Sequence, residues 1–129
     1  MIGIWTSYSD VFLIIAGVTM LATFGLPLLL VPMSWARVFR WEVPKPRNLV
    51  IFLARSLGVF ISIMAIFAFK VTRTSTFKPL YFDLMLWIFG GMILLHGYGA
   101  IRKTQPITET LEILLWIALS VITACFYPV

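Results

Sequence analysis

Four long runs of apolar residues alternate with short polar, charged or proline-containing stretches along the chain. The runs cover residues 11–31, 49–69, 80–101 and 106–127. Each is about 20 residues long, which matches the hydrocarbon thickness of a bilayer when the run is helical. Backbone groups inside a bilayer have no water to bond, so a spanning run must be a helix. The pattern therefore predicts an all-α integral membrane four-helix bundle, in a single domain over residues 1–129.

Polar residues and prolines mark the ends of the predicted helices. Ser9 and Asp10 precede the first run, and both are good N-cap residues. Pro27 is expected to kink this first helix near its far end, and Pro32 is expected to end it. Pro106 suits the first position of the last helix.

The longest connection, residues 33–48, contains a short amphipathic pattern. On a helical wheel Trp35 and Phe39 fall on one side, while Arg37 and Arg40 fall on the other. This pattern is typical of a helix that lies in the membrane interface. It predicts a short interfacial helix between the first and second spanning helices.

The composition supports the membrane interpretation. Hydrophobic residues make up 61% of the 129 residues and charged residues 12%, whereas a soluble domain is about 45–50% apolar and about 25% charged. The formal net charge is +5, but the basic residues flank the apolar runs, so no nucleic-acid partner is expected. The single cysteine, Cys125, allows no intramolecular disulfide.

The basic residues also predict the orientation. Of the nine that lie between the runs, six fall in the first and third connections and three in the second. Cytoplasmic connections carry the excess of Lys and Arg. Both termini are therefore expected on the outer side of a cell membrane.

Three helices place charged or titratable side chains in one layer. Arg55, His96 and Glu112 each lie five or six residues inside the cytoplasmic end of a run, roughly 8–9 Å deep. Glu109 lies one turn nearer the cytoplasm. The functional interpretation is a site that handles protons or holds a ligand such as a quinone or a lipid. The structural interpretation is that Arg55 and Glu112 are neighbours that neutralise each other and tie the bundle together.

Other chemistry is not expected from this layer. His96 is the only histidine, so haem or pigment ligation lacks a second axial partner within the chain. One His and two Glu also fall short of the usual zinc and di-iron ligand sets, so no metal site is predicted. No catalytic residues are assigned, and an enzymatic activity is not expected.

Small residues predict where helices approach closely. Ala54, Gly58 and Ser62 follow one another at a spacing of four, and such stripes allow close helix contacts in membranes. Arg55 shares this face, so we expect it to point into the contact. The third run is expected to pack closely through its own glycines, Gly90, Gly91, Gly97 and Gly99.

The first half of the chain resembles the DoxX-like four-helix membrane proteins. The residues that carry the resemblance are FGLPLLLVPMSWARVFRW and, after a proline-containing connector, FLARSLGVFISIMAIFAF. Arg55 and Gly58 match the Arg–small–Gly pattern that opens the second helix in that family. The resemblance implies the four-helix architecture and an association with quinone-linked oxidoreductase complexes.

Three functions agree with these observations. The first is a non-catalytic accessory or scaffold subunit of a larger membrane assembly, in contact with other membrane subunits or with copies of itself. The second is a quinone- or lipid-binding redox accessory that uses the layer of Arg55, His96 and Glu112. The third is a small dimeric transporter, which ranks last because Asp10 lies at the edge of the first helix and not inside it.

Overall fold

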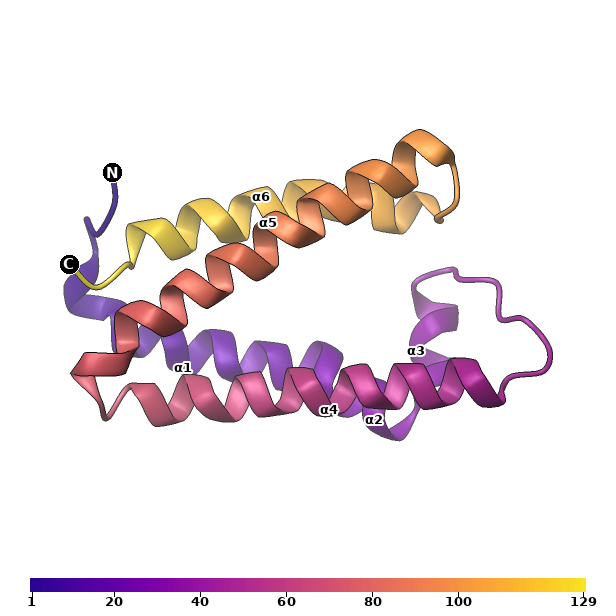
Figure 1. The fold of residues 1–129 in the computed structure, drawn as a ribbon, viewed down its shortest axis with the longest axis horizontal. Coiled ribbons are helices and arrows are strands. Elements are labelled where there is room, and N and C mark those ends of the chain that lie inside the picture. The colour runs from indigo at the N-terminus through magenta and orange to yellow at the C-terminus, as the bar shows by residue number, and fades with distance from the viewer. The chain divides into compact units, whose positions relative to one another are not determined.

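The computed structural model describes residues 1–129 and is all-helical (Figure 1). Its elements are η1 (Thr6–Tyr8), α1 (Ser9–Met20), η2 (Leu21–Gly25), α2 (Leu26–Leu30), α3 (Pro32–Val38), α4 (Asn48–Val71), η3 (Ser75–Phe77), α5 (Lys78–Arg102) and α6 (Ile107–Cys125). Four continuous helical stretches are long and apolar enough to cross a membrane: Thr6–Leu30, Asn48–Val71, Ser75–Arg102 and Ile107–Cys125. The all-α prediction with four such helices is confirmed.

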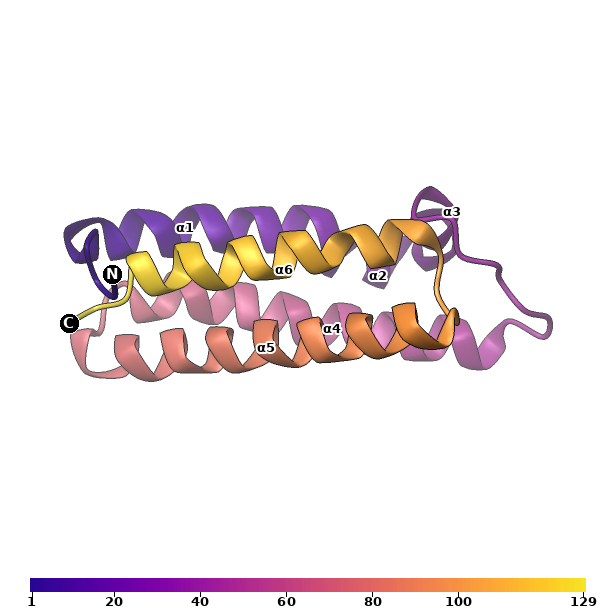
Figure 2. The same cartoon turned by 90° about the horizontal axis from the view of Figure 1, so that it is seen from above.

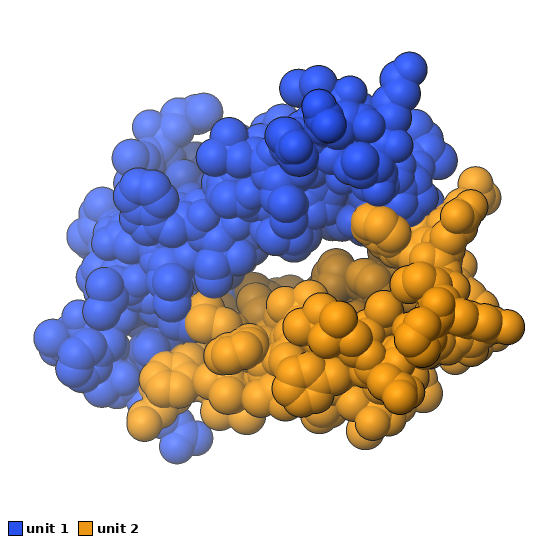
Figure 3. Space-filling model, turned by 45° about the vertical axis from the view of Figure 1, so that its right-hand side comes forward, with its two compact units in different colours: residues 1–12, 71–129 blue, residues 13–70 orange.

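The chain forms two compact units (Figure 3). Unit 1 consists of residues 1–12 and 71–129, and unit 2 consists of residues 13–70. Unit 1 holds η1, η3, α5 and α6 with the first residues of α1, and unit 2 holds the rest of α1, η2, α2, α3 and most of α4.

Two predicted helix starts were wrong, the first by several residues and the last by one. The first spanning stretch begins with a 3-10 turn at Thr6, so Ser9 lies inside the helical stretch and does not cap it. Pro106 is the N-cap of α6 with an extended backbone, and Ile107 is the first helical residue. A proline at the N-cap loses no helical hydrogen bond, because an amide at this position has no acceptor within the helix.

Pro27 perturbs the first helix as predicted, through a π-helical segment at Leu21–Gly25. Pro27 has no N–H, so the carbonyl of Thr23, four residues earlier, lacks its usual helical donor. The indole Nε1 of Trp35 in α3 donates to this carbonyl at 3.0 Å. The carbonyl that Pro27 leaves without a helical donor therefore holds α3, through Trp35, against the first helix.

Glycines set the packing inside unit 2. A Cβ added to Gly58 on α4 would lie 2.7 Å from the Leu29 amide nitrogen and 2.9 Å from the Gly25 carbonyl oxygen. A Cβ on Gly25 would lie 2.7 Å from Ser62 Oγ. Backbone therefore lies directly against backbone where α4 meets the η2–α2 segment, which is the kind of contact that small residues allow.

In unit 1, α5 and α6 form an antiparallel hairpin (Figures 1 and 2). The side of α5 that faces inward carries, at heptad-like spacing, Phe82, Met85, Phe89, His96 and Gly99. Trp116 and Thr123 are buried on α6. This periodicity is that of two helices that pack along most of their length.

The two ends of the chain pair with each other in unit 1. The amides of Gly3 and Trp5 each donate, at 2.9 Å, to the carbonyls of Ala124 and Cys125. These carbonyls belong to the last turn of α6, which lacks the helical donors that follow in the middle of a helix, and the Ala124 carbonyl also accepts from the Tyr127 amide at 3.3 Å. Tyr127 donates its hydroxyl to Asp83 at 2.8 Å, and this bond raises the pKa of Tyr127. The N-terminal segment thus completes the hydrogen bonding at the end of α6.

Three of the four glycines on α5 do not pack as predicted. Nothing lies within 4 Å of a Cβ added to Gly90, Gly91 or Gly97, whereas Gly99 lies against the side chain of Gln105. The reason is their position, because Gly90 and Gly97 lie on the side of α5 away from the buried residues that face α6. The glycine-rich side of α5 is therefore open.

Candidate functional site

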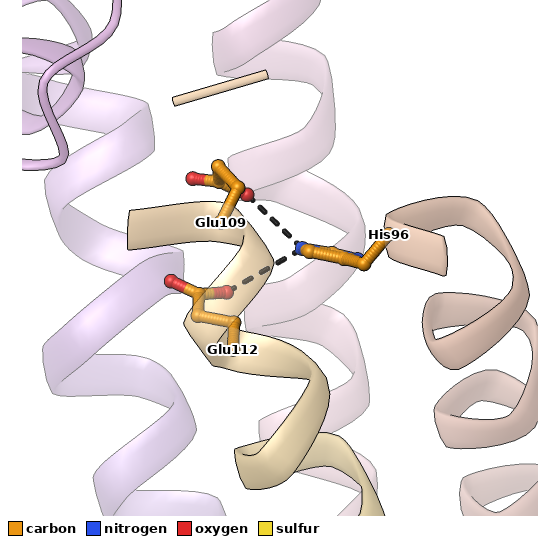
Figure 4. Close-up of side chains that lie close together, drawn as sticks. All are labelled: His96, Glu109 and Glu112. Carbon is orange, nitrogen blue, oxygen red and sulfur yellow. Dashed lines mark hydrogen bonds and ion pairs between the residues drawn. The ribbon is translucent and has the colours of Figure 1, made fainter. Parts of the chain in front are cut away.

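A buried cluster of His96, Glu109 and Glu112 lies in the α5–α6 hairpin (Figure 4). His96 comes from α5 and both carboxylates come from the start of α6. His96 Nε2 lies 3.0 Å from Glu109 Oε2 and 3.6 Å from Glu112 Oε2. The three side chains are 4%, 10% and 12% exposed, in that order. Titratable groups this buried carry a desolvation cost unless they pair with one another.

The imidazole of His96 is oriented by its own helix. Its Nδ1 lies 2.8 Å from the carbonyl oxygen of Met92, one turn earlier. A carbonyl only accepts, so Nδ1 carries the hydrogen in this bond. Nε2 then faces the two carboxylates either as a second donor or with a free lone pair. The helix thus fixes the position and the chemistry of the ring nitrogen that faces the cluster.

The two carboxylates reach the same nitrogen because of helical spacing. Glu109 and Glu112 are three residues apart, so their side chains leave α6 on one side. Glu109 lies in the first turn of α6, where the positive end of the helix dipole favours a carboxylate. The start of α6 therefore suits a concentration of negative charge.

The connection between α5 and α6 positions the two helices in the hairpin. The side-chain amide of Gln105 donates to the His96 carbonyl at 3.0 Å and to Thr110 Oγ1 at 3.1 Å. Its carboxamide lies against Gly99, where a Cβ would collide with the amide oxygen. Gln105 thereby joins the histidine's helix to the helix that carries both glutamates.

Aromatic rings cover the cluster on the side toward the middle of the hairpin. The Trp116 ring lies 6.0 Å from the His96 ring and 5.7 Å from the Phe89 ring. Trp116 is one turn beyond Glu112 on α6 and is buried. The cluster is therefore bounded on this side by apolar rings, and the low local dielectric strengthens its electrostatic interactions.

The charges of the cluster do not balance within it. Two carboxylates and a protonated imidazole sum to one negative charge, and a neutral imidazole leaves two. In an apolar hairpin, such an excess is stabilised by a bound cation or by protons. The arrangement can therefore hold a cation or a hydrogen-bonding ligand.

The structure brings together three of the four residues proposed for the polar layer. Arg55 lies on α4 in unit 2 and is exposed. Gly58 is buried against the η2–α2 backbone, whereas Arg55 is exposed, so the structure does not bury Arg55 in that helix contact as predicted. Its pairing with Glu112 stays a prediction, and the neighbour that the structure gives Glu112 is His96.

Sequence reasoning missed two contributors to the site. Met92 acts through its backbone carbonyl, which no side-chain pattern reveals, although its position one turn before a buried histidine is a usable signal. Gln105 lies in a connection that the sequence marks only as polar, and its role depends on how the hairpin closes.

No family model, curated protein or solved structure matches this chain. The resemblance to DoxX-like proteins therefore stays a prediction.

A second feature of interest lies in unit 2, between α2, α3, α4 and the connection that follows α3. A cavity of about 380 Å³ is lined mostly by apolar residues, among them Leu28, Pro32, Ala54 and Leu57. An adjoining cavity of about 280 Å³ shares its Met33, Trp41 and Val43 and adds the two arginines Arg37 and Arg47. The larger, mostly apolar cavity thus adjoins a smaller cavity lined by two arginines, which we call the basic cavity.

Proposed function

We propose that this chain is a multi-pass integral membrane protein of the cell membrane with both termini on the outer side. Four helices of sufficient length and apolarity support this. The excess of basic residues in the first and third connections supports the orientation.

Thiol labelling across α5 tests this topology. Cys125 is buried, so Cys125→Ala provides the background, and Thr76→Cys and Thr104→Cys place exposed thiols on either side of α5. An impermeant maleimide is expected to label Thr76→Cys in intact cells, and Thr104→Cys only after the membrane is opened. The reverse pattern contradicts the orientation, and equal labelling in intact cells contradicts the crossing of α5.

Within the membrane we propose a non-catalytic role as an accessory or scaffold subunit of a larger assembly. The observation that carries this proposal is the open side of α5. Large apolar residues alternate there with glycines at the a and d spacing of a helix seam: Trp87, Gly90, Leu94, Gly97 and Ile101. Trp87, Leu94 and Ile101 are 82%, 76% and 83% exposed.

The seam on α5 suits a transmembrane helix of a partner subunit. Glycines between large side chains form holes into which another helix can pack at short distance. The seam has no charged residue over Trp87–Ile101, so its natural neighbour is apolar. A partner helix buries the exposed Trp87 ring, whose size makes it a strong contributor to an interface.

Native mass spectrometry in mild detergent tests the accessory role. The chain extracted from its own membranes is expected to retain a partner subunit in constant stoichiometry. Gly90→Leu with Gly97→Leu is expected to lose it, because the added side chains fill the holes of the seam, and nothing within the chain lies within 4 Å of a Cβ at either position. Ala118→Leu, which also introduces a leucine but at an exposed position of α6, serves as the control. A stable monomer or homo-oligomer for the unaltered chain contradicts the proposal.

A second candidate, a lipid-binding accessory, is supported by the cavities of unit 2. Arg37 and Arg47 line the basic cavity, and arginine binds phosphate oxygens in a bidentate manner. The adjoining apolar cavity has room for part of an acyl chain. The ligand that fits both is an acidic phospholipid. The same spectra test it, since Arg37→Gln with Arg47→Gln is expected to lose a bound acidic phospholipid that the unaltered chain retains.

A further inference from the structure

The geometry points to a divalent transition-metal site at His96, Glu109 and Glu112 in the α5–α6 hairpin, with zinc as the ion that the ligand set fits. This departs from the expectation that one histidine and two glutamates are too few ligands. It is independent of the accessory role, which concerns the opposite side of α5.

The ligand atoms already lie near metal-binding separations. His96 Nε2 is 3.0 Å from Glu109 Oε2 and 3.6 Å from Glu112 Oε2, and one ligand atom from each of the three residues lies within 4.8 Å of the others. Around a single ion with metal–ligand distances of about 2.0–2.2 Å, neighbouring ligand atoms are roughly 3.0–3.5 Å apart. Small rotations of the two glutamates therefore suffice to enclose an ion.

The histidine is prepared for ligation by its surroundings. Its Nδ1 is bonded to the Met92 carbonyl at 2.8 Å, and metal-ligating histidines usually donate their second nitrogen to such an acceptor. This leaves Nε2 directed at the carboxylates, as Figure 4 shows. Gln105 donates to the backbone carbonyl of His96, which holds the connection against this part of α5. The residues around the cluster thus hold the ring as the surroundings of a metal ligand do.

Charge selects the kind of ion. A neutral imidazole and two carboxylates carry two negative charges, which one divalent cation cancels inside a site whose side chains are about nine-tenths buried. The imidazole favours zinc, copper, iron or nickel over magnesium, calcium and manganese, which prefer oxygen ligands. Three protein ligands also leave one position of a tetrahedral zinc ion for water or a further ligand.

Metal binding by the full chain tests the site directly. The purified protein, carrying an affinity tag without histidines, is stripped with a chelator and titrated with zinc by calorimetry. One zinc ion per chain is expected to bind. Glu109→Gln and Glu112→Gln are each expected to lower the affinity for zinc at least about tenfold. Each change replaces one of the two carboxylate ligands by a neutral amide. Glu42→Gln, the same change at an exposed position in unit 2, is expected to leave the affinity unchanged.

X-ray absorption of the unaltered zinc-loaded chain provides a test that needs no variant. Because the chain has one histidine, any imidazole signature must come from His96. The expected first shell contains one imidazole nitrogen and oxygens, without sulfur. Absence of stoichiometric zinc binding, a shell without imidazole, a sulfur ligand from Cys125, or equal weakening by Glu42→Gln overturns the proposal.

Discussion

Replacing His96 by leucine is expected to lower the free energy of unfolding of the chain in detergent by about 3–5 kcal/mol, because it removes the imidazole that pairs with the buried carboxylates of Glu109 and Glu112. Leucine fills most of the space of the imidazole, so the loss does not come from a cavity. The measurement is reversible unfolding of the helical signal, made with a chelator present so that metal binding does not contribute.

Two further variants separate the electrostatic cause from a packing cause. Adding Glu109→Gln and Glu112→Gln to His96→Leu is expected to recover much of the lost stability, since neutral amides carry no unpaired charge. The free energy of unfolding of His96→Gln is expected to lie between those of the unaltered chain and His96→Leu, because the glutamine amide still donates toward a carboxylate. If His96→Leu is as stable as the unaltered chain, or if the added glutamines restore nothing, His96 does not stabilise the two glutamates.

Replacing Gly58 by alanine is expected to destabilise unit 2 by about 1–3 kcal/mol. The added Cβ meets the Leu29 amide nitrogen at 2.7 Å and the Gly25 carbonyl oxygen at 2.9 Å. Both are backbone atoms, so no side chain can rotate away and α4 must move off the η2–α2 segment. Thermal unfolding in detergent measures the effect as a lower Tm.

The sign of this effect is informative because helix propensity acts the other way. Alanine is favoured over glycine within a helix by about 0.8–1.0 kcal/mol. Gly91→Ala on α5, where nothing lies within 4 Å of the added Cβ, provides the matched control and is expected to be neutral or stabilising. Equal behaviour of the two variants contradicts the close approach of α4 to the η2–α2 backbone.

Some features of the site follow from local sequence alone. The three-residue spacing of Glu109 and Glu112 places both carboxylates on one side of α6 once that segment is helical. Pro106 and the apolar run after it place the start of the helix within a residue, and with it the position of Glu109 in the first turn. The equal depth of His96 and Glu112 likewise follows from run lengths, since each helical residue advances by a constant rise.

Other features required the packing of the hairpin. Depth alone brings Arg55, His96 and Glu112 to one level, but it does not say which side of each helix faces which neighbour. The α5–α6 packing brings His96 to Glu109, and Gln105 of the connection joins the two helices. The sequence also favours Arg55 as a partner of Glu112, which stays a prediction, because opposite formal charges are visible in a sequence and the rotation of one helix against another is not.

The glycines and the proline show the same division. The sequence alone determined that this chain is built of four long apolar helices, that Pro27 interrupts the first of them, and that small residues recur at contact spacing, because these properties depend on local backbone chemistry and helical period. Only the tertiary structure decided that Gly58 faces backbone while Gly90 and Gly97 face open space, and that Trp35 bonds the carbonyl of Thr23 that Pro27 leaves free. The sequence does not indicate which group lies against a glycine or a free carbonyl, because that depends on the placement of a segment elsewhere in the chain.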